Sequence, residues 1–220
     1  MALTRMLKDR TAIVTGAASG IGRAISVSLA RRGSHLALAD INGAGLAEAA
    51  RLCTEFGVRV SQHRLDVGDR AAVAGFPSAV TAEHPGVDFL INNAGVALGG
   101  TFEQVSEADF EWLFDINFWG VVRMTRAVLP LLHVSKDACI VNVSSLYGLV
   151  APPGQTAYSA AKFAVRGFSQ ALCHELKGTH IGVLLVHPGG SLPPSPTAPA
   201  CRAMFPRRRS HAGAPRSTGT

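Results

Sequence analysis

Residues 12–22 read AIVTGAASGIG, a short apolar run that is followed at once by three glycines within seven positions. The apolar run predicts a buried β-strand, and the glycines permit a tight turn and a close approach of the backbone to a ligand. A helix that begins near Gly20 would point its free N–H groups and the positive end of its dipole at this turn. The stretch therefore predicts a strand, a turn and a helix that together bind a phosphate group, with a tight turn that binds nothing as the alternative.

The same alternation of strand and helix continues along the chain. Apolar runs of strand length, rich in Val, Ile and Leu, lie at 12–15, 35–39, 58–65, 87–91, 138–143 and 181–186. Segments with helical spacing lie between them, at 20–32, 43–56, 69–83, 107–132 and 156–177. Because the apolar runs are continuous, we expect both faces of the strands to be buried, with right-handed crossovers that place helices on each side. This order predicts an α/β fold with a doubly wound parallel sheet of six strands, of the Rossmann type.

Composition indicates one folded domain and a tail. The 220 residues are 47% hydrophobic and 16% charged, as is typical of a globular protein. After Gly190 the sequence changes to SLPPSPTAPACRAMFPRRRSHAGAPRSTGT, which has neither helical nor strand periodicity. We therefore predict a folded domain over residues 1–190 and a disordered tail, rich in Pro and Arg, over residues 191–220.

Charge, cysteine content and hydropathy argue against several classes of function. Five of the 21 basic residues and none of the 15 acidic residues lie in the tail, which leaves about +1 for residues 1–190, so we expect no nucleic-acid partner for the folded domain. The cysteines form no CxxC pair and the histidines form no ligand motif, which predicts reduced thiols and no metal: Cys53, Cys139, Cys173 and Cys201. Without an apolar stretch of about 20 residues or a signal-peptide core, we expect no membrane segment and a cytoplasmic location.

A carboxylate at the end of the second apolar run predicts which dinucleotide would bind. Asp40 follows the residues LALA and lies twenty positions after Gly20. Its side chain can accept hydrogen bonds from both hydroxyl groups of an adenosine ribose, and it would repel a 2′-phosphate. Ser19 stands where an Arg or Lys could otherwise help to bind that phosphate, and we expect Arg23 to lie on the pyrophosphate side or on the surface. The sequence therefore predicts NAD rather than NADP.

The TGxxxGxG spacing resembles that of the short-chain dehydrogenase/reductase family, and further motifs follow in the family's order over residues 8–190. Asp66-Val67 is similar to the adenine contact of the family, Asn92-Asn93-Ala94-Gly95 to its NNAG motif, and Pro188-Gly189 to the turn that approaches the nicotinamide. The resemblance implies cofactor contacts from Gly16, Ser19, Gly20, Ile21, Gly22, Asp40, Asp66, Val67, Asn93, Ala94, Gly95, Tyr158, Lys162, Pro188 and Gly189.

A tyrosine and a lysine stand four residues apart in Tyr158-Ser159-Ala160-Ala161-Lys162, a spacing that places both on one face of a helix. A phenol has a pKa of about 10, and a nearby ammonium favours the phenolate. Ser145, thirteen residues before the tyrosine, would position a substrate oxygen, and Asn117 matches the family's fourth catalytic position, where it would bend its helix and link the lysine to solvent. The resemblance implies that Tyr158 exchanges a proton with an alcohol while a hydride moves to or from the nicotinamide.

The segments expected beside the substrate, 97–100, 146–147 and 152–154, are mostly apolar and uncharged. They favour a small-molecule substrate that is an apolar secondary alcohol or ketone, with Tyr147 beside it. The helices over 107–132 and 156–177 pair across a dimer interface in family members, so we expect a homodimer.

The sequence departs from the family after Gly190, where a threonine, a substrate-covering segment and a seventh strand would follow. One hypothesis is a change of reading frame near codon 190, because the composition switches there abruptly to Pro, Arg, Ser and Ala. Two alternatives to an active enzyme stay open: a nucleotide-binding but inactive or unstable truncated member of the family, and an interaction protein that uses the basic tail.

Overall fold

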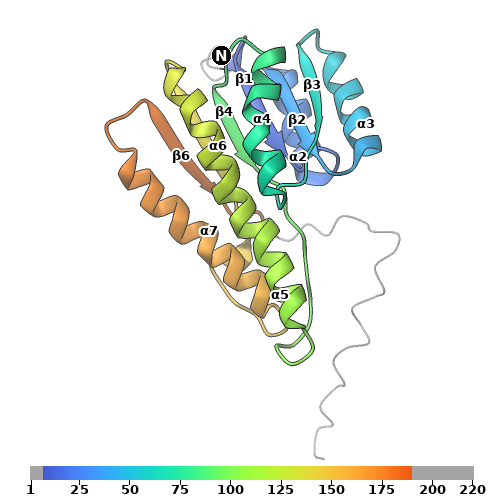
Figure 1. Ribbon diagram of the computed structural model, residues 1–220, viewed down its shortest axis with the longest axis vertical. Helices are drawn as coiled ribbons and strands as arrows, with labels where there is room; N and C mark the ends of the chain where they lie inside the picture. The colour runs from blue at the N-terminus through green and yellow to red at the C-terminus, as the bar shows by residue number, and fades with distance from the viewer. Residues whose placement is uncertain (1–6, 190–220) are drawn as a thin grey trace, which may run out of the picture. The chain divides into compact units, whose positions relative to one another are not determined.

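Six parallel strands form the sheet of the computed structural model, which describes residues 7–189 (Figure 1). They lie in the order β3-β2-β1-β4-β5-β6. This order confirms the predicted doubly wound parallel sheet, and each strand begins and ends within two residues of its predicted bounds. The strands are β1 (Thr11–Thr15), β2 (His35–Asp40), β3 (Val60–Arg64), β4 (Phe89–Asn92), β5 (Ala138–Val143) and β6 (Ile181–Val186).

Helices connect the strands as the apolar spacing predicts. They are α2 (Gly20–Ala30), α3 (Gly43–Thr54), α4 (Arg70–Glu83), α5 (Glu107–Phe114), α6 (Gly120–Val134) and α7 (Thr156–Glu175). The segment predicted as one helix over 107–132 is α5, a π-helix η1 (Asp115–Trp119) and α6 in succession. A single 3₁₀ turn, η2 (Leu146–Gly148), follows β5.

Two apolar layers hold the helices against the sheet. On one face Val14, Leu36 and Leu38 pack with residues of α2 and α3 such as Ala30 and Leu46. On the other face Ile13, Leu90 and Ile140 pack with residues of α4, α6 and α7, among them Val80, Leu132 and Leu172. Successive side chains of a strand point to opposite faces, which is why neighbours such as Ile13 and Val14 belong to different layers.

The last described strand, β6, differs from the expectation of burial on both faces. Leu184 and Val186 are 52% and 37% exposed, whereas Val183, on the α7 face, packs against the core. The expectation is wrong here because α2 and α3 cover only the part of one sheet face that β1, β2 and β3 form. On that face, the described part of the chain places no helix over β6 (Figure 1). The predicted tail over 191–220 lies outside the described residues.

Other expectations concern membranes, metals and thiols. Within residues 7–189, no helix is both long and apolar enough to span a bilayer. In the same range, no group of three His, Cys, Asp or Glu side chains is placed to hold a metal ion. Cys53, Cys139 and Cys173 are free thiols, and Cys201 lies outside the described range.

Candidate active site

The turn between β1 and α2 is built from close backbone contacts. A Cβ atom at Gly22 would overlap the carbonyl oxygen of Gly16, so the first turn of α2 packs directly on the loop. Gly16 itself has a φ of +65°, in the left-handed region that favours glycine. From the loop after the neighbouring strand β4, Asn93 Nδ2 donates to the carbonyl oxygens of Thr15 and Gly16 at 3.0 and 3.2 Å. The first turn of α2 and the side chain of Asn93 therefore fix the loop.

The start of α2 leaves its N–H groups available. Its N-cap residue, Ser19, makes no side-chain capping bond, whereas α3, α4 and α5 are capped by Asn42, Asp69 and Ser106. Ser19 and Gly20 are exposed, and Ile21 is 45% exposed. Free N–H groups at the positive end of a helix dipole suit an anion such as a pyrophosphate.

Asp40 lies at the end of β2, beside the loop. Its Oδ2 accepts from the N–H of Ala18 at 2.9 Å, and its Oδ1 accepts from the N–H of Asn42 at 2.9 Å. Arg23 Nε donates to the carbonyl oxygen of Ala18 at 3.0 Å, so the guanidinium is engaged with the loop backbone. A carboxylate in this place can accept further hydrogen bonds from ribose hydroxyls and repels a 2′-phosphate.

Asp66 and Val67 follow β3 and differ in their surroundings. Asp66 is exposed, and its Oδ1 accepts from the N–H of Gly68 at 2.8 Å. Val67 is buried against α6, where a Cβ at Gly120 would lie 2.8 Å from its Cγ2. The structure thus places Asp66 where a ligand can reach it and uses Val67 as a packing residue.

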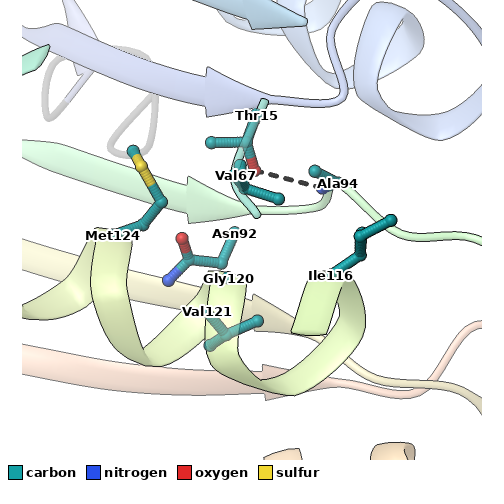
Figure 2. A pocket seen from close by; sticks show the side chains of 8 residues that line it. All are labelled: Thr15, Val67, Asn92, Ala94, Ile116, Gly120, Val121 and Met124. Carbon is teal, nitrogen blue, oxygen red and sulfur yellow. Dashed lines mark hydrogen bonds between the residues drawn. The ribbon is translucent and has the colours of Figure 1, made fainter. Parts of the chain in front are cut away.

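The loop after β4 is held by Thr15. Its Oγ1 accepts from the N–H group of Ala94 at 3.0 Å (Figure 2). The same oxygen accepts from the N–H group of Asn93 at 3.0 Å and donates to the carbonyl oxygen of Ile91 at 3.3 Å. Behind this loop lies a narrow pocket that has no room for a water molecule and is lined by Thr15, Val67, Asn92, Ala94, Ile116, Gly120, Val121 and Met124 (Figure 2). Its lining contains no acid or base, so the pocket supports the loop and is not where proton transfer would occur.

Lys162 and Tyr158 occupy one face of α7, as their spacing predicts. Lys162 is 4% exposed, and its Nζ lies 5.6 Å from the centre of the Tyr158 ring. Nζ donates to the carbonyl oxygen of Val143 at 3.1 Å. Burial lowers the pKa of Lys162 to about 8, because desolvation disfavours the ammonium.

Asn117 lies in η1, so the predicted bend in its helix is a π-helical turn, a feature often found at functional sites. The side chain is fully buried and bonds to the backbone of Val96 twice, with Nδ2 donating at 2.8 Å and Oδ1 accepting at 2.8 Å. A Cβ at Gly95 would lie 3.0 Å from Asn117 Oδ1 and 3.6 Å from Lys162 Nζ. Asn117, Gly95 and Lys162 therefore meet, although they are far apart in the sequence.

Ser145 follows β5 and lies next to η2. Its Oγ accepts from the N–H of Tyr147 at 3.1 Å, and the Tyr147 ring packs edge-on to that of Tyr158, with 6.1 Å between the ring centres. His187 Nδ1 donates to the carbonyl oxygen of Ser145 at 2.8 Å, and the N–H of Leu146 donates to that of Pro188 at 3.1 Å. The segment after β6 thus reaches the loop that carries Ser145, with exposed Gly189 following it.

Four buried polar residues lie near the site: Asn92, the first residue of the NNAG-like motif, and Thr125, Asn142 and Ser169, which were not among the sequence predictions. They bond to one another across β4, β5, α6 and α7. The signal for two of them was an asparagine inside otherwise apolar runs, FLIN and ACIVNV, where a polar side chain needs a buried partner.

Comparisons with known proteins identify relatives of this chain in sequence and in structure. The model of the short chain dehydrogenase family matches residues 10–197. The oxidoreductase SadH of Mycobacterium tuberculosis is 48% identical over 185 residues, which are 83% of this chain and 67% of SadH. A short chain dehydrogenase/reductase from Burkholderia phymatum, solved with NAD, is 34% identical with a TM-score of 0.81 and covers 83% of this chain. An alcohol dehydrogenase from Thermococcus sibiricus, solved with 5-hydroxy-NADP, is 29% identical with a TM-score of 0.79, over 83% of this chain and 77% of that one.

The chain spans about two thirds of the length of the first two of these proteins, 67% of SadH and 66% of the Burkholderia enzyme. The matched region contains the glycine turn, the loop after β4 and the tyrosine–lysine pair of α7. This chain belongs to the short-chain dehydrogenase/reductase family of oxidoreductases.

Proposed function

We propose that this chain transfers a hydride between NAD(H) and an apolar secondary alcohol or ketone. The observation that carries the proposal is the meeting of Lys162, Asn117 and Gly95, with a Cβ at Gly95 lying 3.6 Å from Lys162 Nζ and 3.0 Å from Asn117 Oδ1. Tyr158, the proposed acid and base, lies one turn before Lys162 on α7. These contacts support a role for Tyr158 in proton transfer beside the loop after β4, and residues 1–190 would form the catalytic domain.

The residues around the start of α2 fit a dinucleotide. The uncapped N–H groups after Ser19 would hold the pyrophosphate, and Asp40 would bond to the adenosine ribose. When bound, the nicotinamide supplies the acceptor or donor of the hydride. Of the two solved relatives described above, one contains NAD and the other 5-hydroxy-NADP. The proposed preference for NAD therefore rests on Asp40 and on Ser19, which stands where a basic residue could bind a 2′-phosphate.

Proton transfer is assigned to three side chains. Tyr158 would take the proton of the substrate hydroxyl in oxidation and return it in reduction. Ser145 Oγ already accepts from the N–H of Tyr147, which leaves its own O–H to donate to the substrate oxygen. Lys162 donates one of its three N–H groups to Val143 and would stabilise the anionic phenolate with its charge.

The surroundings of Ser145 support an apolar substrate. Leu146, Leu149 and Val150 follow it and are 43%, 44% and 51% exposed. Exposed apolar side chains beside a polar reacting group suit a substrate whose carbon skeleton covers them.

We also propose a homodimer in the cytoplasm. Trp112 and Trp119 are each 47% exposed and Phe163 is 40% exposed, on the helices expected to pair between subunits. A groove of about 590 Å³ runs along this surface and is lined by Arg70, Ala108, Phe110, Glu111, Trp112, Phe114, Asp115 and Trp119. Light scattering would test the dimer, and a monomer at micromolar concentration would contradict it.

The test of the proposed reaction is a titration with NAD⁺ and, separately, with NADH, followed by a panel of apolar secondary alcohols that are incubated with NAD⁺ and assayed for NADH formation. We expect Tyr158→Phe to lower kcat by about 10²- to 10⁴-fold while NADH binding persists, because only the proton-transfer group is lost. Tyr147→Phe is the control, since it removes the other tyrosine hydroxyl of the site.

A nucleotide-binding but inactive chain is the second candidate. It is favoured by the exposed face of β6, where Leu184 is 52% exposed. NADH binding by the wild type without turnover of any alcohol, and with no further loss in Tyr158→Phe, would favour this candidate over the first.

A further inference from the structure

A chain of buried hydrogen bonds crosses the sheet beneath the candidate active site. Asn92 Nδ2 donates to Thr125 Oγ1 at 3.0 Å and to Asn142 Oδ1 at 2.9 Å. Asn142 Nδ2 donates to Ser169 Oγ at 2.9 Å, and this hydroxyl donates to the carbonyl oxygen of Val165 at 2.7 Å. None of the four side chains is more than 3% exposed. We call Asn92, Thr125, Asn142 and Ser169 the polar clamp.

Burying the polar clamp in the core costs desolvation free energy. Asn92 Oδ1 is buried and has no hydrogen-bond partner. Figure 2 shows the Asn92 side chain between β4 and the helix that carries Gly120 and Met124. Apolar residues of similar size would avoid the desolvation of these amides and hydroxyls and would often stabilise the fold as well or better. Stability alone therefore does not account for the polar clamp.

Each residue of the polar clamp lies on a strand or helix that carries a residue of the candidate site or leads directly to one. Asn92 precedes Asn93, whose amide holds the glycine turn. Asn142 lies on β5 three residues before Ser145. Thr125 lies on α6, which continues directly from the π-helix that carries Asn117, and Ser169 lies on α7 two turns after Lys162.

Two further hydrogen bonds join α7 to the end of β5. Lys162 Nζ donates to the carbonyl oxygen of Val143, and Ser144 Oγ donates to the carbonyl oxygen of Lys162 at 3.1 Å. Apolar packing is not directional, so it lets a helix slide or rotate on a sheet more readily than hydrogen bonds do. The Asn142–Ser169 bond therefore adds to these two contacts a third hydrogen bond, two turns farther along α7, that restricts the rotation of the helix on β5.

We propose that the polar clamp is a positioning device, which holds α7 against β5 so that Tyr158 and Lys162 face Ser145 and Asn117. The inference rests on the proposed function for its catalytic meaning. Its structural content, the placement of Tyr158, stands separately and can be measured without turnover.

The first experiment uses nuclear magnetic resonance of protein labelled with ¹³C at the ζ carbon of tyrosine. The chain has two tyrosines, so Tyr147→Phe assigns both signals. Ser169→Ala leaves Asn142 Nδ2 without its acceptor, and we expect the Tyr158 signal to shift and broaden. Ser34→Ala is the matched control, because Ser34 is also fully buried and its Oγ donates to a backbone carbonyl, that of Leu7, at 2.7 Å.

The second experiment measures kinetics of the same proteins. We expect Ser169→Ala and Thr125→Val to lower kcat by about tenfold with NADH affinity changed less than about twofold, because a small displacement of a reacting group is costly. Thr125→Ser keeps the hydroxyl and should restore kcat. Ser34→Ala should lower the Tm without changing kcat.

The outcomes separate the two proposals. If Ser169→Ala lowers the Tm like Ser34→Ala but leaves the Tyr158 signal at its wild-type position, the polar clamp is only structural and the inference is overturned. If the Tyr158 signal shifts in Ser169→Ala while the wild type turns over no alcohol, the positioning stands and the proposed function fails.

Discussion

The carboxylate of Asp40 accepts a hydrogen bond from the backbone N–H of Ala18, with 2.9 Å between the oxygen and the nitrogen. The residue that would choose between NAD and NADP is thus bonded to the loop that would hold the pyrophosphate. A substitution at this position changes the charge near the ribose and can also change the shape of the loop, so the two effects need separate variants.

Asp40→Asn removes the charge and keeps an oxygen that can accept from Ala18. We expect the Kd of NADPH to fall by about tenfold, or 1.4 kcal/mol, because the repulsion of the 2′-phosphate is lost. Asp40→Ala should also weaken NADH binding, because the loop loses its anchor. Fluorescence titration of both cofactors measures this, with Asp69→Asn, at the start of α4, as the control. An unchanged ratio of the two Kd values in Asp40→Asn would rule out the charge as the selector.

Gly22→Ala should abolish cofactor binding and strongly destabilise the fold. Its Cβ would overlap the carbonyl oxygen of Gly16 and would lie 2.6 Å from Asn93 Nδ2, so the turn cannot keep its shape. Gly75→Ala is the contrasting variant, because Gly75 is exposed within α4 and a Cβ there would have no atom within 4 Å. We expect it to raise the free energy of unfolding by about 0.4–1 kcal/mol. Urea unfolding of both variants measures the two changes in the free energy of unfolding. Equal changes in Gly22→Ala and Gly75→Ala would contradict the prediction.

Lys162→Met should stabilise the folded chain at neutral pH while removing activity. The pKa of Lys162 is about 8 in the folded state, below its ordinary value of 10.5, so between these values the unfolded chain binds more protons and stability rises with pH. The variant lacks this dependence, and its advantage of at most about 3 kcal/mol should be largest below pH 8 and shrink toward pH 10.5. Chemical unfolding from pH 7 to 10 measures the difference, with exposed Lys136→Met as the control for charge. A difference that stays constant over this range would refute the burial argument.

His84 should make the chain sensitive to acid. It is 2% exposed, its Nε2 lies 2.9 Å from Ser61 Oγ, and its Nδ1 has no partner. Burial, reinforced by the positive charges of Arg59, His35 and His63 and opposed by Glu83, lowers the pKa of His84 to about 4. The unfolded chain therefore binds more protons between pH 6.5 and 4, and stability falls as the pH falls through this window.

His84→Leu should remove this dependence, so that the variant gains up to about 3 kcal/mol on the wild type between pH 7 and pH 4. Urea unfolding at several pH values measures how the free energy of unfolding changes with pH. The loss of the bond to Ser61 lowers this free energy by the same amount at every pH and does not affect the slope. His133→Ala, at an exposed position, is the control. Parallel pH profiles for wild type and His84→Leu would show that another group governs acid unfolding.

The sequence predicts the strands and helix starts well because apolar runs and caps are local signals. β5 and β6 begin and end where the apolar runs do. The spacing predicts ends for α2 and α3 that are each two residues too late, because polar and apolar residues continue in helical spacing past Ala30 and Thr54. The helices end there because Gly33 and Gly57, with φ of +86° and +71°, donate to the carbonyl oxygens of Ala30 and Thr54.

The site was predictable where its residues are close in sequence, as with Tyr158 and Lys162 on one helix face. Contacts between segments that are far apart in the sequence were not predictable. Asn92 and Asn142 are 50 residues apart, and they meet because β4 pairs with β5 in a register that sets them side by side. Likewise, the bond between Asp40 and Ala18 depends on β1 lying beside β2, which is a property of the strand order rather than of either motif.

The strand order also determines when each strand can pair while the chain is being synthesised on the ribosome. β1 can pair with β2 early, but its other edge waits for β4, and the backbone N–H of Thr11 bonds to Asp88, which is 77 residues later. At about 5–20 residues per second, this gap lasts roughly 4–15 s, during which one edge of the central strand is open. The glycine turn that follows β1 therefore emerges long before Asn93, the side chain that fixes it. A nascent chain held before residue 93 should be open to proteases at residues 15–22, and one released after it should not.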